Sequence, residues 1–370
     1  PEYVGEKRFA NWLAEAKDWN ISRNRFWGSC IPLWINTEDS SDIICVGSVA
    51  ELEELSGQKV TDLHKQFIDR IEIRREGKLY RRTPEVLDCW FESGSMPYAQ
   101  HHYPFENKDA FDAREVYPAD FIAEGVDQTR GWFFTLHAIS AMITGEVSFR
   151  AVVSNGLVLD KNGNKMSKRL GNAVDPFASI EKYGSDPLRW YMITNASPWD
   201  NLKFDIEGVE EVTRKFFGTL YNTYSFFALY ANVDGFRFSE PLVPVHRRPE
   251  IDRWIISLLN TLVREVTECY EDYEPTRAGR LIQDFVTEHL SNWYVRLNRK
   301  RFWGGRMDED KLAAYQTLYT CLVTVAKLMS PIAPFYADRL YLDLNGSTGL
   351  EPFESVHLSD FPGYDASVTD

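Results

Sequence analysis

The sequence predicts an α/β domain of the doubly wound type followed by an all-α helical bundle. Residues 120–159 alternate between strand, helix and strand patterns, and polar residues follow directly after the first strand. From about residue 206 onward, apolar residues recur at the three- and four-residue spacing of amphipathic helices. Because ligands of doubly wound sheets bind at the carboxyl ends of the strands, the polar residues there are candidates for a binding site.

Composition narrows the class of protein. A chain of 370 residues with 44% hydrophobic and 26% charged residues is typical of a soluble globular protein of two or three domains. No signal peptide is recognisable and no apolar run approaches ~18 residues, so we expect a cytoplasmic protein with no membrane partner. The five cysteines form no Cys-x-x-Cys pair, which predicts neither a disulfide framework nor a structural zinc or other metal site. A net charge of −14 argues against a general nucleic-acid binder, although a local basic stripe can still bind RNA.

A small insertion is predicted at about residues 45–82. It begins with a short helix that is closed by Gly57. The charged run from Arg70 to Arg82 follows, in which Ile71 and Ile73 alternate with polar residues as in an exposed strand.

The α/β pattern occupies about residues 83–160. Residues 120–124 form a predicted strand that ends at Gly125. A helix is expected to start near Asp127 and to run to Gly145, and residues 152–159 give the next strand. This order places a polar motif at the carboxyl end of the first strand.

A loop with two lysines follows the second strand. Lys165-Met166-Ser167-Lys168 lies in a segment rich in Gly and Asn, which turn the chain easily and predict a mobile loop. Two ammonium groups on such a loop can hold a polyphosphate and follow the charge that develops on a leaving pyrophosphate. The alternative is an ordinary solvated surface loop.

The remaining sequence is predicted to be helical. Asp175-Pro176 and Asp186-Pro187 each place Pro at the first helical position behind an acidic cap, which predicts two short helices. Apolar periodicity predicts longer helices at 251–266, 278–293 and 312–329, enough for a bundle. The tail after Pro334 has no clear pattern.

Four blocks of the chain together resemble one family. They are Asp18 to Gly28, Pro84 to Gly94, Glu124 to Phe133 and Lys165 to Lys168, and they occur in the same order as in isoleucyl-tRNA synthetases, which are class I aminoacyl-tRNA synthetases. The resemblance implies an α/β nucleotide-binding (Rossmann-like) half-domain over residues 1–205, with the lysine loop region at 151–205. It implies a helical anticodon-binding domain over residues 206–370.

The class also carries a His-x-Gly-His element, which none of the seven histidines here matches. We therefore expect a fragment that lacks the N-terminal half of the active site and the editing domain, and that is inactive alone.

The resemblance implies an isoleucine–tRNA ligase. Such an enzyme activates L-isoleucine with ATP and Mg²⁺ as substrate and transfers it to tRNA(Ile); we expect it to be a monomer. Lys165 and Lys168 would be catalytic through charge stabilisation, and Met166 and Ser167 would lie at the adenylate. A valyl-tRNA synthetase fragment and a non-catalytic tRNA-binding module are the alternatives.

The motif after the first strand gives the other substrate contacts that the resemblance implies. Glu124, Gly125, Asp127 and Gln128 would bind ATP and the adenylate, with the Asp127 carboxylate accepting from ribose hydroxyls. Asp127 can instead cap the helix that follows.

Two tryptophans would form the isoleucine side-chain pocket. Trp90 and Trp132 offer large, rigid apolar walls, whereas plain core packing is the alternative for each of them.

Two basic and aromatic clusters would contact tRNA. Arg23, Arg25 and Trp27 would touch the acceptor end, with exposed salt-bridged arginines as the alternative. In the helical part, base stacking and phosphate pairing are predicted for a run near a helix end that contains Arg296, Arg299, Lys300 and Arg301. Cations in a last helical turn also suit the helix dipole, and Trp293 continues the apolar stripe.

Overall fold

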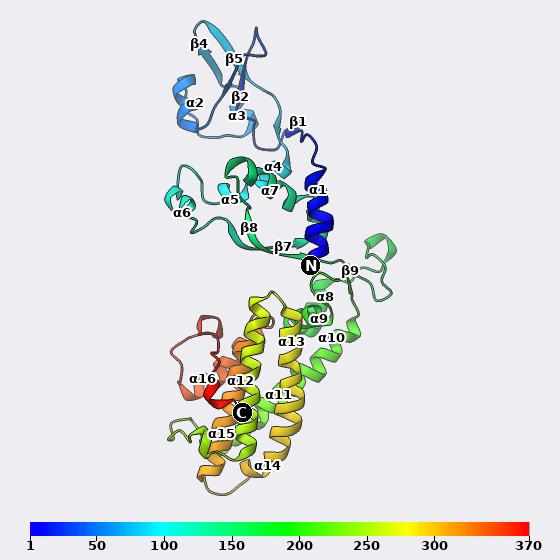
Figure 1. Ribbon diagram of the computed structural model, residues 1–370, viewed down its shortest axis with the longest axis vertical. Helices are drawn as coiled ribbons and strands as arrows, with labels where there is room; N and C mark the ends of the chain where they lie inside the picture. The colour runs from blue at the N-terminus through cyan, green and yellow to red at the C-terminus, as the bar shows by residue number, and fades with distance from the viewer. Residues whose placement is uncertain (370) are drawn as a thin grey trace. The chain divides into compact units, whose positions relative to one another are not determined.

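The computed structural model describes residues 1–369 and divides the chain into two compact units, the first at Pro1–Ser154 and the second from Asn155 onward (Figure 1). Each unit is described by itself. The first unit contains the predicted strand–helix–strand pattern together with a separate small sheet, and the second is almost entirely helical.

The small sheet of the first unit has four antiparallel strands in the order β3-β2-β5-β4. Their bounds are β2 (Leu33–Asn36), β3 (Ile43–Cys45), β4 (Glu72–Arg75) and β5 (Lys78–Arg82). Helix α2 (Val49–Ser56) ends at Gly57 in the left-handed conformation, as predicted. Its cap is Ser48, whose hydroxyl accepts the amide of Glu51.

The prediction of one exposed strand between Arg70 and Arg82 was wrong. The run is a β4–β5 hairpin that turns at Gly77, with φ of +78°. Ile71 and Ile73 are buried against Trp34 in the core of the small sheet, because the alternation marks a half-buried face and not a solvated one.

The strand–helix–strand motif is present. Strand β7 (Ala119–Gly125) pairs with β8 (Phe149–Asn155), and helix α7 (Trp132–Ile143) connects them. The expected helix start near Asp127 was wrong, because residues Val126–Arg130 form the 3₁₀ turn η2 and Gly131 leaves the helical conformation. The side chain of Gln128 then accepts the amide of Trp132 at 2.9 Å, which starts α7 afresh.

Shorter elements complete the first unit. They are η1 (Val4–Phe9), α1 (Ala10–Ala14), β1 (Ser22–Arg23), α3 (Lys65–Ile68), β6 (Val86–Leu87), α4 (Cys89–Gly94), α5 (Met96–Ala99) and α6 (Lys108–Asp112).

The predicted strand at 152–159 is broken at Gly156. Strand β8 ends at Asn155, and β9 (Val158–Leu159) pairs instead with β10 (Leu202–Lys203) in parallel. The amide of Gly156 donates to the carbonyl of Pro198, and a Cβ at Gly156 would lie 2.3 Å from the carbonyl oxygen of Asp200. Glycine is therefore required by the close approach of this second segment.

Of the two predicted Asp-Pro helix starts, one is correct. Helix α8 (Pro176–Tyr183) begins behind Asp175, whose carboxylate accepts the amide of Phe177. Helix α9 (Ser185–Asn195) begins two residues earlier than predicted, behind Gly184, so that Asp186 lies in its first turn and is not its cap.

The second unit is a helical bundle. Its elements are η3 (Lys168–Leu170), α10 (Ile206–Val212), η4 (Thr213–Phe217), α11 (Gly218–Asp234), η5 (Val245–Arg247), α12 (Glu250–Glu271), α13 (Pro275–Asp284), η6 (Phe285–Val295), α14 (Arg296–Phe302), α15 (Glu309–Met329), α16 (Pro334–Thr348), η7 (Val356–Leu358) and η8 (Ala366–Val368). Helices α11, α12, α13 and α15 lie side by side around one large apolar core (Figure 1). The tail after Pro334, which the pattern left unassigned, begins with α16 and continues through the short turns η7 and η8.

The helix predicted at 278–293 changes its winding. Residues Phe285–Val295 form the π-helix η6, which departs from the 3.6-residue period. Trp293 continues the apolar stripe in the sequence, but its side chain is 57% exposed. The wider winding of η6 turns this position out of the buried face of the helix.

Candidate active site

The lysine loop is a braced turn in the second unit. Lys165 pairs with Leu159 across the loop as an antiparallel bridge. Oδ1 of Asp160 accepts the amides of Asn162 at 3.0 Å and Asn164 at 2.8 Å, which closes the turn between them. A hydrogen bond from the Asn172 side chain contributes most, followed by that from the Asn164 amide, to holding the pKa of the Asp160 carboxyl below its usual value.

Asn172 joins the two ends of this loop. Its Nδ2 donates to Oδ2 of Asp160 at 3.0 Å and to the carbonyl of Lys165 at 3.2 Å, and its Oδ1 accepts the amide of Ser167 at 2.9 Å. The Ser167 hydroxyl in turn accepts the amide of Leu170 and starts η3. Neither Asp160 nor Asn172 was selected from the sequence, although Asx turns in a Gly- and Asn-rich loop were a usable signal.

The brace leaves the cations exposed. Lys165 and Lys168 are both exposed, whereas Met166 packs on the apolar cluster of Tyr191 and Leu202 and anchors the segment. Lys203, which the sequence analysis missed, brings its side chain to within 3.2 Å of the position that a Cβ on Gly163 would take. The loop therefore presents several ammonium groups to solvent while hydrogen bonds hold its backbone in place.

The strand-end motif lies in the first unit. Glu124 and Asp127 are exposed at the end of β7, and Nε2 of Gln128 donates to Oδ2 of Asp127 at 3.2 Å. The cap position of the turn η2 is occupied by Gly125 and that of α7 by Gly131, so Asp127 caps neither element. A Cβ on Gly125 would lie 2.5 Å from Oδ1 of Asp127, so glycine is needed for the carboxylate to lie against the backbone.

Both predicted pocket tryptophans lie beside this motif. The ring of Trp90 is 3.2 Å from where a Cβ on Gly131 would be, and Trp90 remains 42% exposed. Trp132 is half-buried and its Nε1 donates to the carbonyl of Ser93 at 2.9 Å. Two indole walls therefore stand next to the Gln128 side chain, and one of them is fixed by a hydrogen bond.

The predicted acceptor-end residues are of two kinds. Arg23 is held by Asp88, with Nη2 and Oδ1 at 3.2 Å, and it also donates to the carbonyl of Ser22. Arg25 and Trp27 are exposed, Trp27 at 69%. Asp88 is buried and was missed in the sequence, although it stands directly before α4 in one of the four blocks.

The basic run of the helical unit also divides. Arg296, Arg299 and Lys300 are exposed on α14. The guanidinium of Arg301 instead forms paired bonds to Asp252, at 2.7 and 2.9 Å, and further bonds to Asp310. Arg301 thus holds α14 to α12 and α15, and its charge is used inside the protein.

Two absences concern only residues 1–369. Within them, no group of three or more His, Cys, Asp or Glu side chains is placed to hold a metal ion. Among the same residues, every helix lacks the length or the apolar character that a membrane-spanning segment needs.

The chain is similar over its whole length to curated ligases. It is 62% identical over 398 residues to an isoleucine–tRNA ligase of Bacteroides fragilis. The alignment covers 100% of this chain and 35% of the relative. It is 44% identical over 374 residues to the isoleucine–tRNA ligase of Thermus thermophilus. That alignment covers 100% of this chain and 36% of the relative. The chain therefore spans about a third of the length of these relatives.

Solved structures share the fold. A leucyl enzyme from Agrobacterium radiobacter K84, solved as a LeuRS–tRNA–LeuAMS complex, matches with a TM-score of 0.71 and 19% identity over 99% of this chain and 46% of its own. Mycobacterium tuberculosis methionyl-tRNA synthetase with methionyl-adenylate matches with a TM-score of 0.65 and 19% identity. This match covers 94% of the present chain and 58% of the methionyl enzyme. The chain has the Rossmann-like catalytic fold of these enzymes, followed by a helix-rich region.

Two family models match separate parts of the chain. Residues 252–369 match the anticodon-binding domain of tRNA ligases. Residues 1–205 match the model for class I tRNA synthetases of the I, L, M and V group. Because this second match covers more than half of the sequence, the chain belongs to the class I tRNA synthetases of that group.

Proposed function

We propose that this chain is the part of an isoleucine–tRNA ligase that supplies the lysine loop, the strand-end motif and the helical tRNA-binding region. The observation that carries the proposal is the 62% identity to an isoleucine enzyme along the whole chain. The two family matches support a catalytic region at residues 1–205 and an anticodon-binding region within 206–370.

In the first step, the isoleucine carboxylate attacks the α-phosphate of ATP, which enters with Mg²⁺, and pyrophosphate leaves. Such chemistry needs positioning and charge stabilisation more than a protein nucleophile. Lys165 and Lys168 are proposed to neutralise the charge that grows on the pyrophosphate. Their exposure above the Asn172 brace supports this role, since both ammonium groups are free to reach a ligand while their backbone is fixed.

The strand-end motif is proposed to hold the adenylate. The Asp127 carboxylate can accept from both ribose hydroxyls, and Gln128 can donate and accept. Gly125 and Glu124 complete this group, because glycine admits the ligand close to the backbone. The indole rings of Trp90 and Trp132 are proposed to enclose the isoleucine side chain, and the bond from Trp132 to Ser93 supports a rigid wall.

In the second step, the acyl group moves to the terminal ribose of tRNA(Ile). Arg25 and Trp27 are proposed to meet the acceptor end, and Arg296, Arg299 and Lys300 another part of the tRNA. Their exposure supports these contacts, whereas the pairing of Arg23 and Arg301 makes those two positioning residues. A monomer acting in the cytoplasm is part of the same proposal.

The test uses a chimaera in which these 370 residues replace the matching segment of the Bacteroides fragilis relative. ATP–pyrophosphate exchange is measured with isoleucine, valine, leucine and methionine. Isoleucine should give the highest exchange. Preference for valine would favour a valyl-tRNA synthetase, and no exchange with any amino acid, together with retained tRNA binding, would favour a non-catalytic module.

A further inference from the structure

The short helix α1 carries a tryptophan that meets the strand-end motif of the same unit. The guanidinium of Arg130 lies over the ring of Trp12, with its Cζ 4.3 Å from the ring centroid. Arg130 is the last residue of η2, the turn that also contains Asp127 and Gln128. A guanidinium at this distance from an indole face makes a cation–π contact. Helix α1 therefore touches the turn that is proposed to hold the adenylate.

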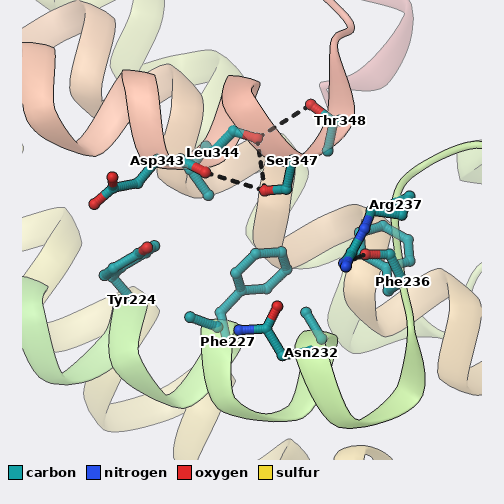
Figure 2. A pocket seen from close by; sticks show the side chains of 11 residues that line it. Tyr224, Phe227, Asn232, Phe236, Arg237, Asp343, Leu344, Ser347 and Thr348 are labelled. Carbon is teal, nitrogen blue, oxygen red and sulfur yellow. Dashed lines mark hydrogen bonds between the residues drawn. The ribbon is translucent and has the colours of Figure 1, made fainter.

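The guanidinium of Arg130 depends on this contact. Some arginines of the chain bind protein oxygens, as Arg237 does in a pocket of the helical unit, where its Nη1 donates to the carbonyl of Phe236 at 2.9 Å (Figure 2). The Arg130 guanidinium forms neither a hydrogen bond nor an ion pair with any of residues 1–369, and the residue is exposed. A long exposed side chain without a partner samples many rotamers. Trp12 is therefore the partner that holds this guanidinium in one position.

The winding of η2 relates Arg130 to the residues proposed to bind the ligand. In a 3₁₀ helix, side chains three residues apart lie one above the other on the same face, and Asp127 and Arg130 are three residues apart. Oδ2 of Asp127 also accepts Nε2 of Gln128 at 3.2 Å. The face of η2 that meets Trp12 is thus the face that carries the Asp127 carboxylate.

The turn η2 needs support from outside itself. It spans only Val126–Arg130, begins at Gly125, which has no side chain to cap it, and has the poorer hydrogen-bond geometry of a 3₁₀ helix. Gly131 follows with a non-helical backbone, so α7 does not continue the turn. One tie comes from Gln128, whose Oε1 accepts the amide of Trp132 at 2.9 Å. The contact with α1 supplies a second tie, from a segment more than a hundred residues earlier in the chain.

Helix α1 is in a position to give this support because the chain just before it is anchored. Phe9, the last residue of η1, packs on the apolar cluster of Ile122 and Phe133, and its ring lies 5.9 Å from that of His137, edge to face. Residues three apart on a helix are neighbours on one side of it, so Phe9 and Trp12 face the same part of the unit. Phe9 thus fixes the helix, and Trp12 reaches η2 from it.

We propose that Trp12 is a positioning residue for ATP in the adenylation step. It holds Arg130, and through Arg130 the turn η2, so that Asp127 and Gln128 are already in place when the ribose arrives. Trp12 itself touches no substrate. This inference rests on the proposed function, because it needs the strand-end motif to bind the adenylate.

The test uses matched substitutions of Trp12 in the chimaera, read by ATP–pyrophosphate exchange. Trp12→Leu keeps an apolar side chain without an aromatic face and should raise the KM for ATP about three- to fivefold, whereas the KM for isoleucine should stay constant. Trp12→Phe keeps an aromatic face and should restore most of the affinity for ATP. A folding defect would instead lower the amount of active enzyme, and so the apparent kcat, with both KM values unchanged.

A second arginine substitution tests whether Trp12 acts through Arg130. Arg130→Met should raise the KM for ATP about as much as Trp12→Leu, and the double variant should be no worse than either single variant. Arg8→Met is the control, since Arg8 is an exposed arginine of η1, and it should have no effect.

The outcomes separate this inference from the proposed function. If the unmutated chimaera shows no exchange with isoleucine, the proposed function fails and this inference fails with it. If exchange is normal, this inference alone is overturned by any of three results. These are an unchanged KM for ATP in Trp12→Leu, an equal loss in Trp12→Leu and Trp12→Phe, or effects of Trp12→Leu and Arg130→Met that multiply in the double variant.

Discussion

Asn172 Nδ2 donates to Oδ2 of Asp160 at 3.0 Å, and this bond closes the lysine loop across twelve residues. The same amide group holds the carbonyl of Lys165 and the amide of Ser167. The two lysines proposed to act on phosphate therefore share one side chain that fixes their backbone. This arrangement leads to a prediction for a residue that carries no charge.

Asn172→Ala in the chimaera should slow adenylate formation about tenfold, with little change in isoleucine binding. The reason is that loss of the brace removes hydrogen bonds worth about 1 kcal/mol each while both ammonium groups remain. Single-turnover adenylation measures the rate. Asn162→Ala is the matched control, since Asn162 contributes only its backbone amide to the turn. An equal effect of the two substitutions would contradict the role of the brace.

Lys168→Ala should lower the adenylation rate constant by the equivalent of roughly 2–4 kcal/mol, because its charge is proposed to act mainly in the transition state. Isoleucine affinity should barely change. Lys161→Ala is the control, as Lys161 is an exposed lysine of the same loop outside the motif. A rate constant that Lys168→Ala leaves unchanged in pre-steady-state measurements would refute the proposed role.

Trp132→Ala should reduce discrimination between isoleucine and larger aliphatic amino acids by about tenfold, because the rigid wall of the pocket is lost. ATP affinity should stay nearly constant. Trp132→Phe keeps an aromatic face but loses the bond to the Ser93 carbonyl, so it separates the wall from the hydrogen bond. Pyrophosphate exchange with four amino acids gives the result, and an unchanged order and spread of preferences would identify Trp132 as core packing.

The sequence was sufficient for elements that local pattern determines. Helix α2, with its terminal Gly57, and strand β7 follow from side chains next to one another in the chain. The fold class was also predicted correctly, since both the strand–helix–strand order and the apolar periodicity of the bundle are local signals.

Long-range contacts explain what the sequence could not give. The strand breaks at Gly156 because the backbone at Asp200 approaches it closely. The residues next to Gly156 in the sequence give no sign of this contact. Arg301 was grouped with its basic neighbours, but its partner Asp252 lies 49 residues away on another helix. Such pairings are fixed by tertiary packing and not by local pattern.

Arg301 and Arg299 should therefore respond oppositely to substitution. Arg301→Ala should destabilise the chain by roughly 3–5 kcal/mol, because the fully buried carboxylate of Asp252 would lose the cation that pairs with it. Arg299→Ala should leave stability within about 0.5 kcal/mol. It should weaken tRNA binding and lower the dependence of log affinity on log salt by about 1.

Urea unfolding gives the stability of these two variants, and filter binding over a range of salt gives the tRNA affinity. If Arg299→Ala unfolds the chain while Arg301→Ala only weakens RNA binding, the assignment of the two residues is reversed. If Arg299→Ala does not change the salt dependence, the exposed basic run makes no phosphate contact.

Asp186 gives a prediction about pH. Its Oδ2 accepts the amide of Tyr336 at 2.5 Å, in the first turn of α16, which is a different helix from its own. The side chain is buried, and burial raises the pKa of the Asp186 carboxyl, opposed by the Tyr336 amide and by the charge of Arg189. Because the folded state then holds the proton more tightly than the unfolded state, its contribution to the free energy of unfolding falls as pH rises through the raised pKa.

Asp186→Asn should remove this penalty while an amide oxygen still accepts from Tyr336. The variant should therefore gain stability relative to the parent between about pH 4.5 and about pH 7, by roughly 1 kcal/mol. Asp186→Ala also loses the hydrogen bond to the Tyr336 amide at the start of α16. It should therefore be less stable than the parent at both pH values, by about 1 kcal/mol. Urea unfolding at the two pH values measures the difference. If Asp186→Asn instead loses stability as pH rises, the helix end and Arg189 outweigh burial, and the ionised carboxylate is the stabilising form.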